Sequence, residues 1–283
     1  MFDQQMGLSD VVALPDRRRR PRVPHRLQRR EGERIRLLGQ VMDKVRPEEV
    51  MHQLTTWVEA GEKAVIANHN LHSLHLIRTE PQVADFFARA DLVQIDSTPL
   101  VAFGRLVGRG TRRKHRSTYL DWREHFWALA DRKGWRVMFI GGADGVAELA
   151  AERLRSRHQN VALAVHPGYF DAAPGSPDNR ALLARVEAFA PQVLMVGMGM
   201  PRQEIWIADH LDALPDCVVL NVGAAFDYEA GIQKAAPRWM GKLGLEWLYR
   251  LAVDPRRLFH RYCVEPWHLM GPIMDDLRSA LRR

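Results

Sequence analysis

The stretch Val193-Leu-Met-Val-Gly-Met-Gly-Met-Pro-Arg-Gln-Glu-Ile-Trp-Ile207 decides the fold class of this chain. Its first four residues are apolar, which predicts a buried strand, and Gly197 and Gly199 interrupt the run. A helical segment follows Pro201. A strand that passes through glycines into a helix presents backbone N–H groups and a helix N-terminus at one point, where phosphate can bind. The turn also carries a guanidinium, an amide and a carboxylate, which together favour a polar ligand with an anionic part, such as a nucleotide-sugar.

The same alternation of strand and helix recurs along the chain. An amphipathic helix is expected over 47–60, and strands are expected over 64–67, 91–95, 136–140, 161–165, 193–196 and 218–222. This order predicts an α/β fold with a doubly wound, mostly parallel, Rossmann-like sheet. Ligands of such sheets bind outside the carboxyl ends of the strands. Residues suited to binding follow these ends: Asn68, Asn70, Asp96, Gly141, Gly142, His166, Gln203 and Asp227.

The bulk composition limits the class of protein. With 283 residues, of which 46% are hydrophobic and 27% charged, the chain has the composition of a soluble globular protein. Two cysteines make no disulfide framework, which fits a reducing compartment. No apolar run reaches the roughly 18 residues of a spanning helix. The N-terminal arginines precede no apolar segment, so no signal peptide is expected.

The net charge of +7 is concentrated at the two ends. Residues 1–36 hold ten arginines and five acidic residues, residues 250–283 hold seven and four, and the remainder carries −1. We therefore expect a basic, disordered N-terminal arm (1–33), an α/β catalytic domain (34–243) and a C-terminal aromatic and basic helical appendage (244–283). Basic ends suit a nucleic acid or an anionic membrane surface, and a solvated tail is the simpler alternative.

Aromatic and basic residues are mixed after residue 244, which is typical of a membrane interface. Arg250, Arg257 and Arg261 are spaced by seven and four, so one helical face could present all three to anionic headgroups and a lipid diphosphate. A helix pair packed on the sheet, with its arginines reaching outward to solvent, explains the same pattern. The sequence leaves both interpretations open.

Five motifs occur in a fixed order: Gly197-Met-Gly-Met-Pro-Arg-Gln-Glu204, Val222-Gly-Ala-Ala-Phe-Asp227 with Gly231, Ala236-Pro-Arg-Trp239, Gly244-Leu-Glu-Trp-Leu-Tyr-Arg250 and Arg257-Leu-Phe-His-Arg-Tyr262. With them the chain resembles, from about Leu37 to Leu269, the WecG/TagA/CpsF family of bacterial glycosyltransferases. The resemblance implies transfer of a sugar from a UDP-sugar to a polyprenyl-diphosphate-linked saccharide, with inversion and a β-linkage. It implies a peripheral enzyme at the cytoplasmic face of the plasma membrane, in exopolysaccharide or surface polysaccharide synthesis.

The resemblance also assigns site residues. It implies that Asp96 is the catalytic general base, although an Asp after a strand is often only a helix N-cap. The family's active-site cation falls in the segment 112–121, where Arg113, Lys114 or Arg116 could supply it. Asp227 could bind sugar hydroxyls or fix the loop that runs through Gly231. The other substrate-binding positions are Asn68 (in place of Thr), Asn70, Gly197, Gly199, Arg202 (in place of Lys) and Gln203.

Two other classes of protein were weighed. The segment Gly141-Gly-Ala-Asp-Gly145 suggests a nucleotide-dependent oxidoreductase or epimerase, but the strand after it ends in His166-Pro-Gly168 without the acidic residue of a dinucleotide site. No cofactor is therefore expected. The arginine arm suggests a nucleic-acid-binding protein, but a core of charge −1 should not bind, so no nucleic acid is expected. The oligomeric state stays open, a homo-oligomer included.

His69, His72 and His75 are spaced by three and raise the question of a metal. No Cys, Asp or Glu lies close in sequence to complete a site, and the chain has no Asp-x-Asp. Substrate contact or the start of a helix is the better interpretation of these histidines. Without a metal, helix N-termini and Arg or Lys side chains must neutralise the leaving diphosphate.

Overall fold

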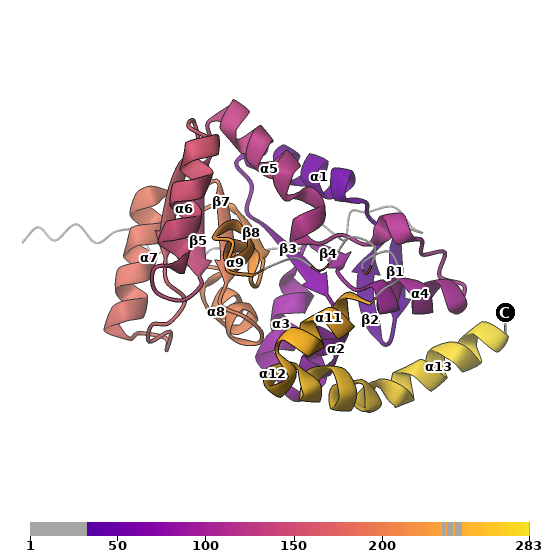
Figure 1. The fold of residues 1–283 in the computed structure, drawn as a ribbon. Helices are drawn as coiled ribbons and strands as arrows, with labels where there is room; N and C mark the ends of the chain where they lie inside the picture. The colour runs from indigo at the N-terminus through magenta and orange to yellow at the C-terminus, as the bar shows by residue number, and fades with distance from the viewer. Residues whose placement is uncertain (1–32, 234–235, 237–239, 241–244, 283) are drawn as a thin grey trace, which may run out of the picture.

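The computed structural model describes residues 33–233, 236, 240 and 245–282 (Figure 1). Except for Glu33, the basic arm expected over 1–33 lies outside these residues. So do most of the Ala236-Pro-Arg-Trp239 motif and the first residue of the Gly244–Arg250 motif.

A six-stranded parallel sheet forms the centre of the molecule, in the order β4-β3-β8-β7-β5-β6. Its strands are β3 (Ala64–His69), β4 (Leu92–Ile95), β5 (Arg136–Gly141), β6 (Ala162–His166), β7 (Val193–Gly197) and β8 (Val218–Asn221). Each begins within one residue of the position expected from the sequence. The predicted doubly wound α/β fold is confirmed.

Helices cover both faces of the sheet (Figure 1). Val193 and Met195 point into a core formed with α1 (Pro47–Ala60), α5 (Tyr119–Lys133), α6 (Val146–Arg157) and α9 (Ala225–Glu229). Leu194 and Val196 point into the opposite core, formed with α2 (Leu71–Thr79), α3 (Pro81–Arg89), α7 (Pro177–Phe189) and α8 (Arg202–His210). Because both faces of the sheet are buried, β7 is apolar at every position from Val193 to Val196. This explains the apolar run in the sequence.

A hairpin and a 3-10 turn were not expected from the sequence, whereas a helix after Asp96 was one of the alternatives. The strands β1 (Arg34–Leu37) and β2 (Gln40–Asp43) pair antiparallel, and α4 (Thr98–Leu106) and a 3-10 turn (η2, Arg113–His115) follow β4. The hairpin strands are only four residues long, too short for a clear alternating pattern. They form a third apolar cluster with α4 and the C-terminal segment.

The C-terminal segment is helical, as expected. It comprises α11 (Glu246–Val253), α12 (Pro255–Phe259), a π turn (η3, His260–Val264), a 3-10 helix (η4, Glu265–Leu269) and α13 (Met270–Leu281). One inference from spacing is wrong, because Arg250, Arg257 and Arg261 do not share one continuous helix. Asp254 leaves the helical conformation (φ −137°, ψ 70°) because it precedes Pro255.

Polar contacts fix this segment to the body of the protein. Glu246 accepts from Arg116, and Glu265 pairs with His72 on α2. Further along, Asp276 pairs with Arg109 at 3.0 Å and accepts from the backbone N–H of Leu38 in the hairpin. The 3-10 helix η4 packs against α2, and in Figure 1 α13 runs outward to the chain end.

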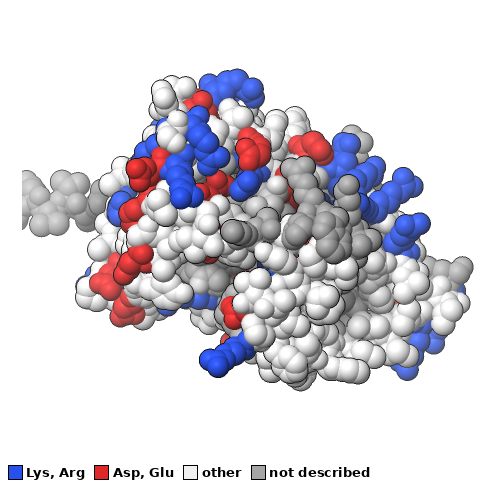
Figure 2. All heavy atoms as spheres, in the orientation of Figure 1, with Lys and Arg blue, Asp and Glu red and all other residues white. Residues whose placement is uncertain are grey.

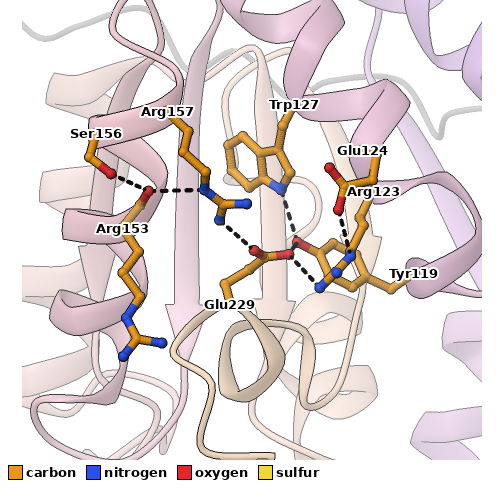
Figure 3. Close-up of polar contacts among 8 residues, drawn as sticks. All are labelled: Tyr119, Arg123, Glu124, Trp127, Arg153, Ser156, Arg157 and Glu229. Carbon is orange, nitrogen blue, oxygen red and sulfur yellow. Dashed lines mark hydrogen bonds and ion pairs between the residues drawn. The ribbon is translucent and has the colours of Figure 1, made fainter. Parts of the chain in front are cut away.

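Glu229, at the end of α9, is the centre of a buried polar network (Figure 3). Its carboxylate accepts from the hydroxyl of Tyr119 at 2.9 Å and pairs with Arg123 and Arg157. The indole N–H of Trp127 donates in turn to the Tyr119 hydroxyl. The network joins α5, α6 and α9, and so holds the short helix after β8 in a fixed place.

Replacing Glu229 with Ala is expected to lower the free energy of unfolding by about 2–3 kcal/mol, because a buried hydroxyl loses its acceptor and two guanidinium groups lose their partner. Exposure of Arg157 to water keeps the loss below that of a fully buried pair. Urea unfolding measures the change. Glu124→Ala is the matched control, because Glu124 also pairs with Arg123 but is 73% exposed, and its loss should stay within about 0.5 kcal/mol. Equal midpoints for the two variants would contradict this role for Glu229.

Candidate active site

Asp96 lies at the carboxyl end of β4, where its backbone N–H donates to the carbonyl of His69 at the end of β3. The residue at the N-cap of α4 is Ser97, so Asp96 is not the helix cap that its position in sequence also allowed. Burial raises the pKa of Asp96 to about 6, against the opposing charges of Arg250, Arg116 and Arg261. At neutral pH the group is therefore an ionised carboxylate that can accept a proton near its own pKa.

Three guanidinium groups act on this carboxylate, and each comes from a different element. Arg116 follows η2, Arg250 lies on α11 and Arg261 lies on η3. Arg116 forms two hydrogen bonds to Glu246, at 3.0 and 3.1 Å. Arg261 is half-buried, and its buried Nε has no hydrogen-bond partner in the described residues. The arrangement places an excess of positive charge around one carboxylate.

The structure separates the three cations that the sequence left open. Arg116 forms an isolated parallel β-bridge with Ile95, the residue before Asp96. The charge of Arg116 lowers the pKa of Asp96. Arg113 and Lys114 are exposed on η2. Lys114 acts instead on His115, whose pKa is lowered mainly by burial and next by this charge. Of the three cations, Arg116 is thus the one whose charge acts on Asp96.

The glycines at the strand ends allow close packing. A Cβ on Gly197 would lie 2.4 Å from the carbonyl oxygen of Gly223, and one on Gly141 would lie 2.3 Å from that of Gly197. These two positions require glycine because three neighbouring backbones meet there. Gly199 differs, since a Cβ there would meet no atom within 4 Å. Its positive φ of +79° requires glycine, and the space beside it is open to a ligand.

Gln203 and its neighbours form a buried amide network beneath the site. Gln203 accepts from the backbone N–H of Gly223 and donates to Glu204 at 2.7 Å. Asn221 also donates to Glu204, and Asn68 donates to the Asn221 carbonyl. Burial raises the pKa of Glu204. Gln203 is only 1% exposed, so its contacts join the loops after β7 and β8.

Asn70 and Arg202 also have partners within the protein. Asn70 is the N-cap of α2 and accepts from the backbone N–H of Ser73. Arg202 donates to the carbonyl of Phe170 and lies over the Phe170 ring. These contacts fix the loops around the strand ends.

The loop through Gly231 is closed by backbone bonds. The carbonyl of Asp227 accepts from the N–H groups of Ile232 and Gln233, at 3.0 Å each. The neighbouring Tyr228 accepts a hydrogen bond from Arg250 at 2.7 Å. The backbone carbonyl of Asp227 thus helps to fix this loop, which is one of the two roles considered for the residue.

The three spaced histidines point to separate partners. His69 is buried, bonds to Ser73 and stacks on Phe87. His72 pairs with Glu265, and the ring of His75 lies against that of His268. Within the described residues no group of three or more His, Cys, Asp or Glu side chains could hold a metal ion.

Sequence reasoning missed part of the site. It assigned Arg250 and Arg261 to the membrane and the lipid diphosphate, whereas in the structure the charges of both act on Asp96. It did not single out Tyr228 or Asn221. Their only signal was position, because Asn221 ends β8 and Tyr228 lies on the short helix that follows it.

Comparison with known proteins agrees with this geometry. The family described as "Glycosyl transferase WecG/TagA/CpsF family" matches residues 35–283. The chain belongs to this family. The WecG/TagA/CpsF assignment identifies the protein as a glycosyltransferase and favours sugar transfer over the oxidoreductase, epimerase and nucleic-acid-binding alternatives.

Similar curated proteins come from Staphylococcus aureus. Those of strain MRSA252 and strain NCTC 8325 / PS 47 are each 28% identical to this chain over 215 residues, which cover 72% of this chain and 82% of the relative. Both are named N-acetylglucosaminyldiphosphoundecaprenol N-acetyl-beta-D-mannosaminyltransferase. That name describes a sugar transferase that acts on a lipid-linked acceptor.

Proposed function

We propose that this protein transfers a sugar from a UDP-sugar to a polyprenyl-diphosphate-linked saccharide, with inversion at the anomeric carbon and formation of a β-linkage. The product would enter a bacterial exopolysaccharide or cell-surface polysaccharide. One observation carries the proposal: the charges of Arg116, Arg250 and Arg261 all act on the buried Asp96 carboxylate. Inverting transfer needs a base for the acceptor hydroxyl and positive charge for a diphosphate. The names of the S. aureus relatives support the class of acceptor.

In this mechanism Asp96 accepts the proton of the acceptor hydroxyl as that oxygen attacks the anomeric carbon. The bond to the UDP oxygen breaks on the opposite face, and the leaving diphosphate takes the electron pair. Arg250 and Arg261 neutralise the charge that develops there, and Arg261 has an unused Nε–H among the described residues to donate. The open turn at Gly199 and the N-terminus of α8 offer further N–H groups. Guanidinium groups thus take the place that a divalent metal has in other transferases.

A donor screen tests this function. The protein would be incubated with a synthetic polyprenyl-diphosphate sugar and a panel of UDP-sugars, with and without EDTA, and released UDP would be measured. UDP release that requires both substrates and survives EDTA is expected. Binding of NAD(P) without UDP release would overturn the function. Strict dependence on Mn²⁺ would overturn the metal-free account of the leaving group.

The rate should depend on pH through Asp96. The pKa of this group is raised to about 6, and only the ionised form can act as a base. We therefore expect kcat/KM to fall as pH decreases through about 6 and to level off above it. A pH series with the best donor measures this acidic fall of kcat/KM. A fall centred near pH 4, where ordinary carboxylates titrate, would contradict the electrostatic environment described for Asp96.

We also propose that the enzyme is cytoplasmic and peripheral at the inner face of the plasma membrane. Large apolar side chains are exposed on the C-terminal segment: Trp247, Leu248, Val253, Phe259, Trp267, Met270, Met274 and Leu281. Figure 2 shows that the visible face of these helices carries few charged side chains. Exposed aromatic and aliphatic groups of this kind suit the headgroup boundary of a bilayer. Among the described residues, no helix is both long and apolar enough to cross a membrane.

Replacing Phe259 and Trp267 together with Ser should weaken binding to anionic vesicles by roughly tenfold or more, because each side chain loses apolar area that the bilayer would bury. They are 58% and 72% exposed, so the fold should tolerate the change. Vesicle co-sedimentation measures the effect. Tyr169→Ser is the control, because Tyr169 is 77% exposed but lies on the loop after β6. Equal binding by both variants would place the membrane contact elsewhere.

A further inference from the structure

Tyr228 lies between the core and the C-terminal segment. It precedes Glu229 on α9, and Glu229 is fixed to α5 and α6 by Tyr119, Arg123 and Arg157 (Figure 3). The Tyr228 side chain is half-buried. A helix of five residues anchored in this way gives the phenol ring a stable base. The hydroxyl at its end is therefore held at a defined point.

Two donors already occupy the Tyr228 hydroxyl oxygen. Arg250 donates to it through Nη2 at 2.7 Å, and Gln233 donates through Nε2 at 3.1 Å. With its oxygen accepting from both, the hydroxyl has only its hydrogen left to offer. In the described part of the chain, this hydrogen has no acceptor. The hydroxyl is thus a donor without a partner, next to a guanidinium group.

The surroundings identify the kind of acceptor. The carboxylates of Asp96 and Glu246 both act electrostatically on the hydroxyl, which places it near the proposed base. The nearest cation, Arg250, acts on Asp96 as well. An O–H group beside a guanidinium is suited to an anionic oxygen, because both donors can point at one charge. The anionic oxygens that the proposed reaction brings to this pocket are those of a diphosphate.

We propose that Tyr228 binds a diphosphate oxygen of the substrate through its hydroxyl hydrogen and, with the same oxygen atom, holds Arg250 in position. This inference rests on the proposed function and deepens it. The diphosphate is either that of the UDP-sugar, which is bonded to the reacting anomeric carbon, or that of the lipid-linked acceptor, which enters with the saccharide that carries the attacking hydroxyl. Phenylalanine at this position would keep the ring and its packing but lose the donor, and it would leave the Arg250 guanidinium with Tyr262 as its remaining tyrosine partner.

Tyr228→Phe and the control Tyr119→Phe test the proposal. Tyr119 is also a tyrosine of this network, but its hydroxyl serves Glu229 and Trp127 rather than the site. For Tyr228→Phe, kcat/KM should fall roughly 10–100-fold, the loss of hydrogen bonds to charged groups. A rise in KM for the UDP-sugar, with weaker binding of UDP alone, assigns the hydroxyl to the donor diphosphate. A rise in KM for the lipid-linked acceptor alone assigns it to the acceptor diphosphate.

The pH profile separates this role from a structural one. Because the charge of Arg250 lowers the pKa of Asp96, a guanidinium that has lost its anchor should let that pKa rise, and the acidic limb should move to higher pH. The charges of Arg116, Arg261 and Asp121 also face Asp96 and stay in place in this variant. In Tyr119→Phe the acidic limb of the kcat/KM profile should stay at its wild-type pH, although the melting temperature should fall.

Three results would overturn the inference. The first is wild-type kinetics and an unchanged acidic limb in Tyr228→Phe. The second is a limb that moves equally in both variants, and the third is equal losses of rate that follow equal losses of stability. If the wild-type protein releases no UDP with any donor and acceptor, the proposed function itself fails, so the two failures are distinguishable.

Discussion

Replacing Asp96 with Asn is expected to lower the rate of sugar transfer by roughly 10²–10⁴ and to leave the affinity for UDP nearly unchanged. Asn keeps the size and polarity of the side chain but cannot accept the proton of the acceptor hydroxyl. UDP should still bind, because the charges assigned to its diphosphate are those of Arg250 and Arg261. Single-turnover transfer and calorimetric titration with UDP measure the two quantities separately.

The stability of Asp96→Asn provides an internal control. In the folded protein the pKa of Asp96 is about 6, above its ordinary value near 4, so the fold disfavours the ionised form. This cost to stability is absent at low pH and appears as pH rises through the range between these two values. A neutral Asn does not incur it, so at pH 8 the variant should melt no lower than wild type. An inactive variant that is also less stable would leave the loss of rate unexplained by chemistry, and near-normal turnover would remove Asp96 from the role of base.

The fold followed from sequence because its signals are local. Val193–Val196 is apolar at every position and is followed by glycine and a helix, and the same order recurs for the other strands. Buried parallel strands impose this pattern on their own residues, whichever strands they pair with. The hairpin at 34–43 was missed because its strands are four residues long and are stabilised by Leu269 and other distant residues of the same cluster. Contacts so remote in sequence leave no local pattern.

Only part of the candidate site could be predicted from the sequence, because some of its residues are brought together by contacts that are distant in sequence. Asp96 and Gln203 follow β4 and β7, and Asn68 lies near the end of β3, so the sequence could place all three near the strand ends that parallel topology brings together. Arg250 and Arg261 belong to a segment that folds back over those ends through Glu246, Glu265 and Asp276, and nothing local to the arginines shows this. The mixture of arginine and aromatic residues in this segment is typical of a segment that binds a membrane surface. Both are half-buried and their charges act on Asp96, which makes a direct role in binding the diphosphate the stronger proposal.

Replacing Arg261 with Gln is expected to lower kcat/KM by roughly 10²–10³, equally on a long-chain lipid acceptor and on a short, water-soluble one. Burial lowers the pKa of Arg261, and Asp96 and Glu265 act on it in the opposite direction, so its charge lies inside the pocket. Its Nε–H is unused in the described residues. A charge desolvated in this way stabilises a diphosphate much more than an exposed arginine would. Assays with both acceptors, together with vesicle co-sedimentation, measure the effect.

The matched control for this change is Arg256→Gln. Arg256 lies on α12, five residues before Arg261, but its side chain is exposed. Its replacement should leave turnover on the soluble acceptor near wild type and should weaken only binding to anionic vesicles, by the contribution of about 1 kcal/mol that one surface cation makes. Arg261→Gln should show the reverse, with vesicle binding kept and turnover lost. If Arg261→Gln instead releases the protein from vesicles and keeps full activity on the soluble acceptor, Arg261 belongs to the membrane surface, as its sequence context first suggested, and the pocket must hold its diphosphate with Arg116 and Arg250.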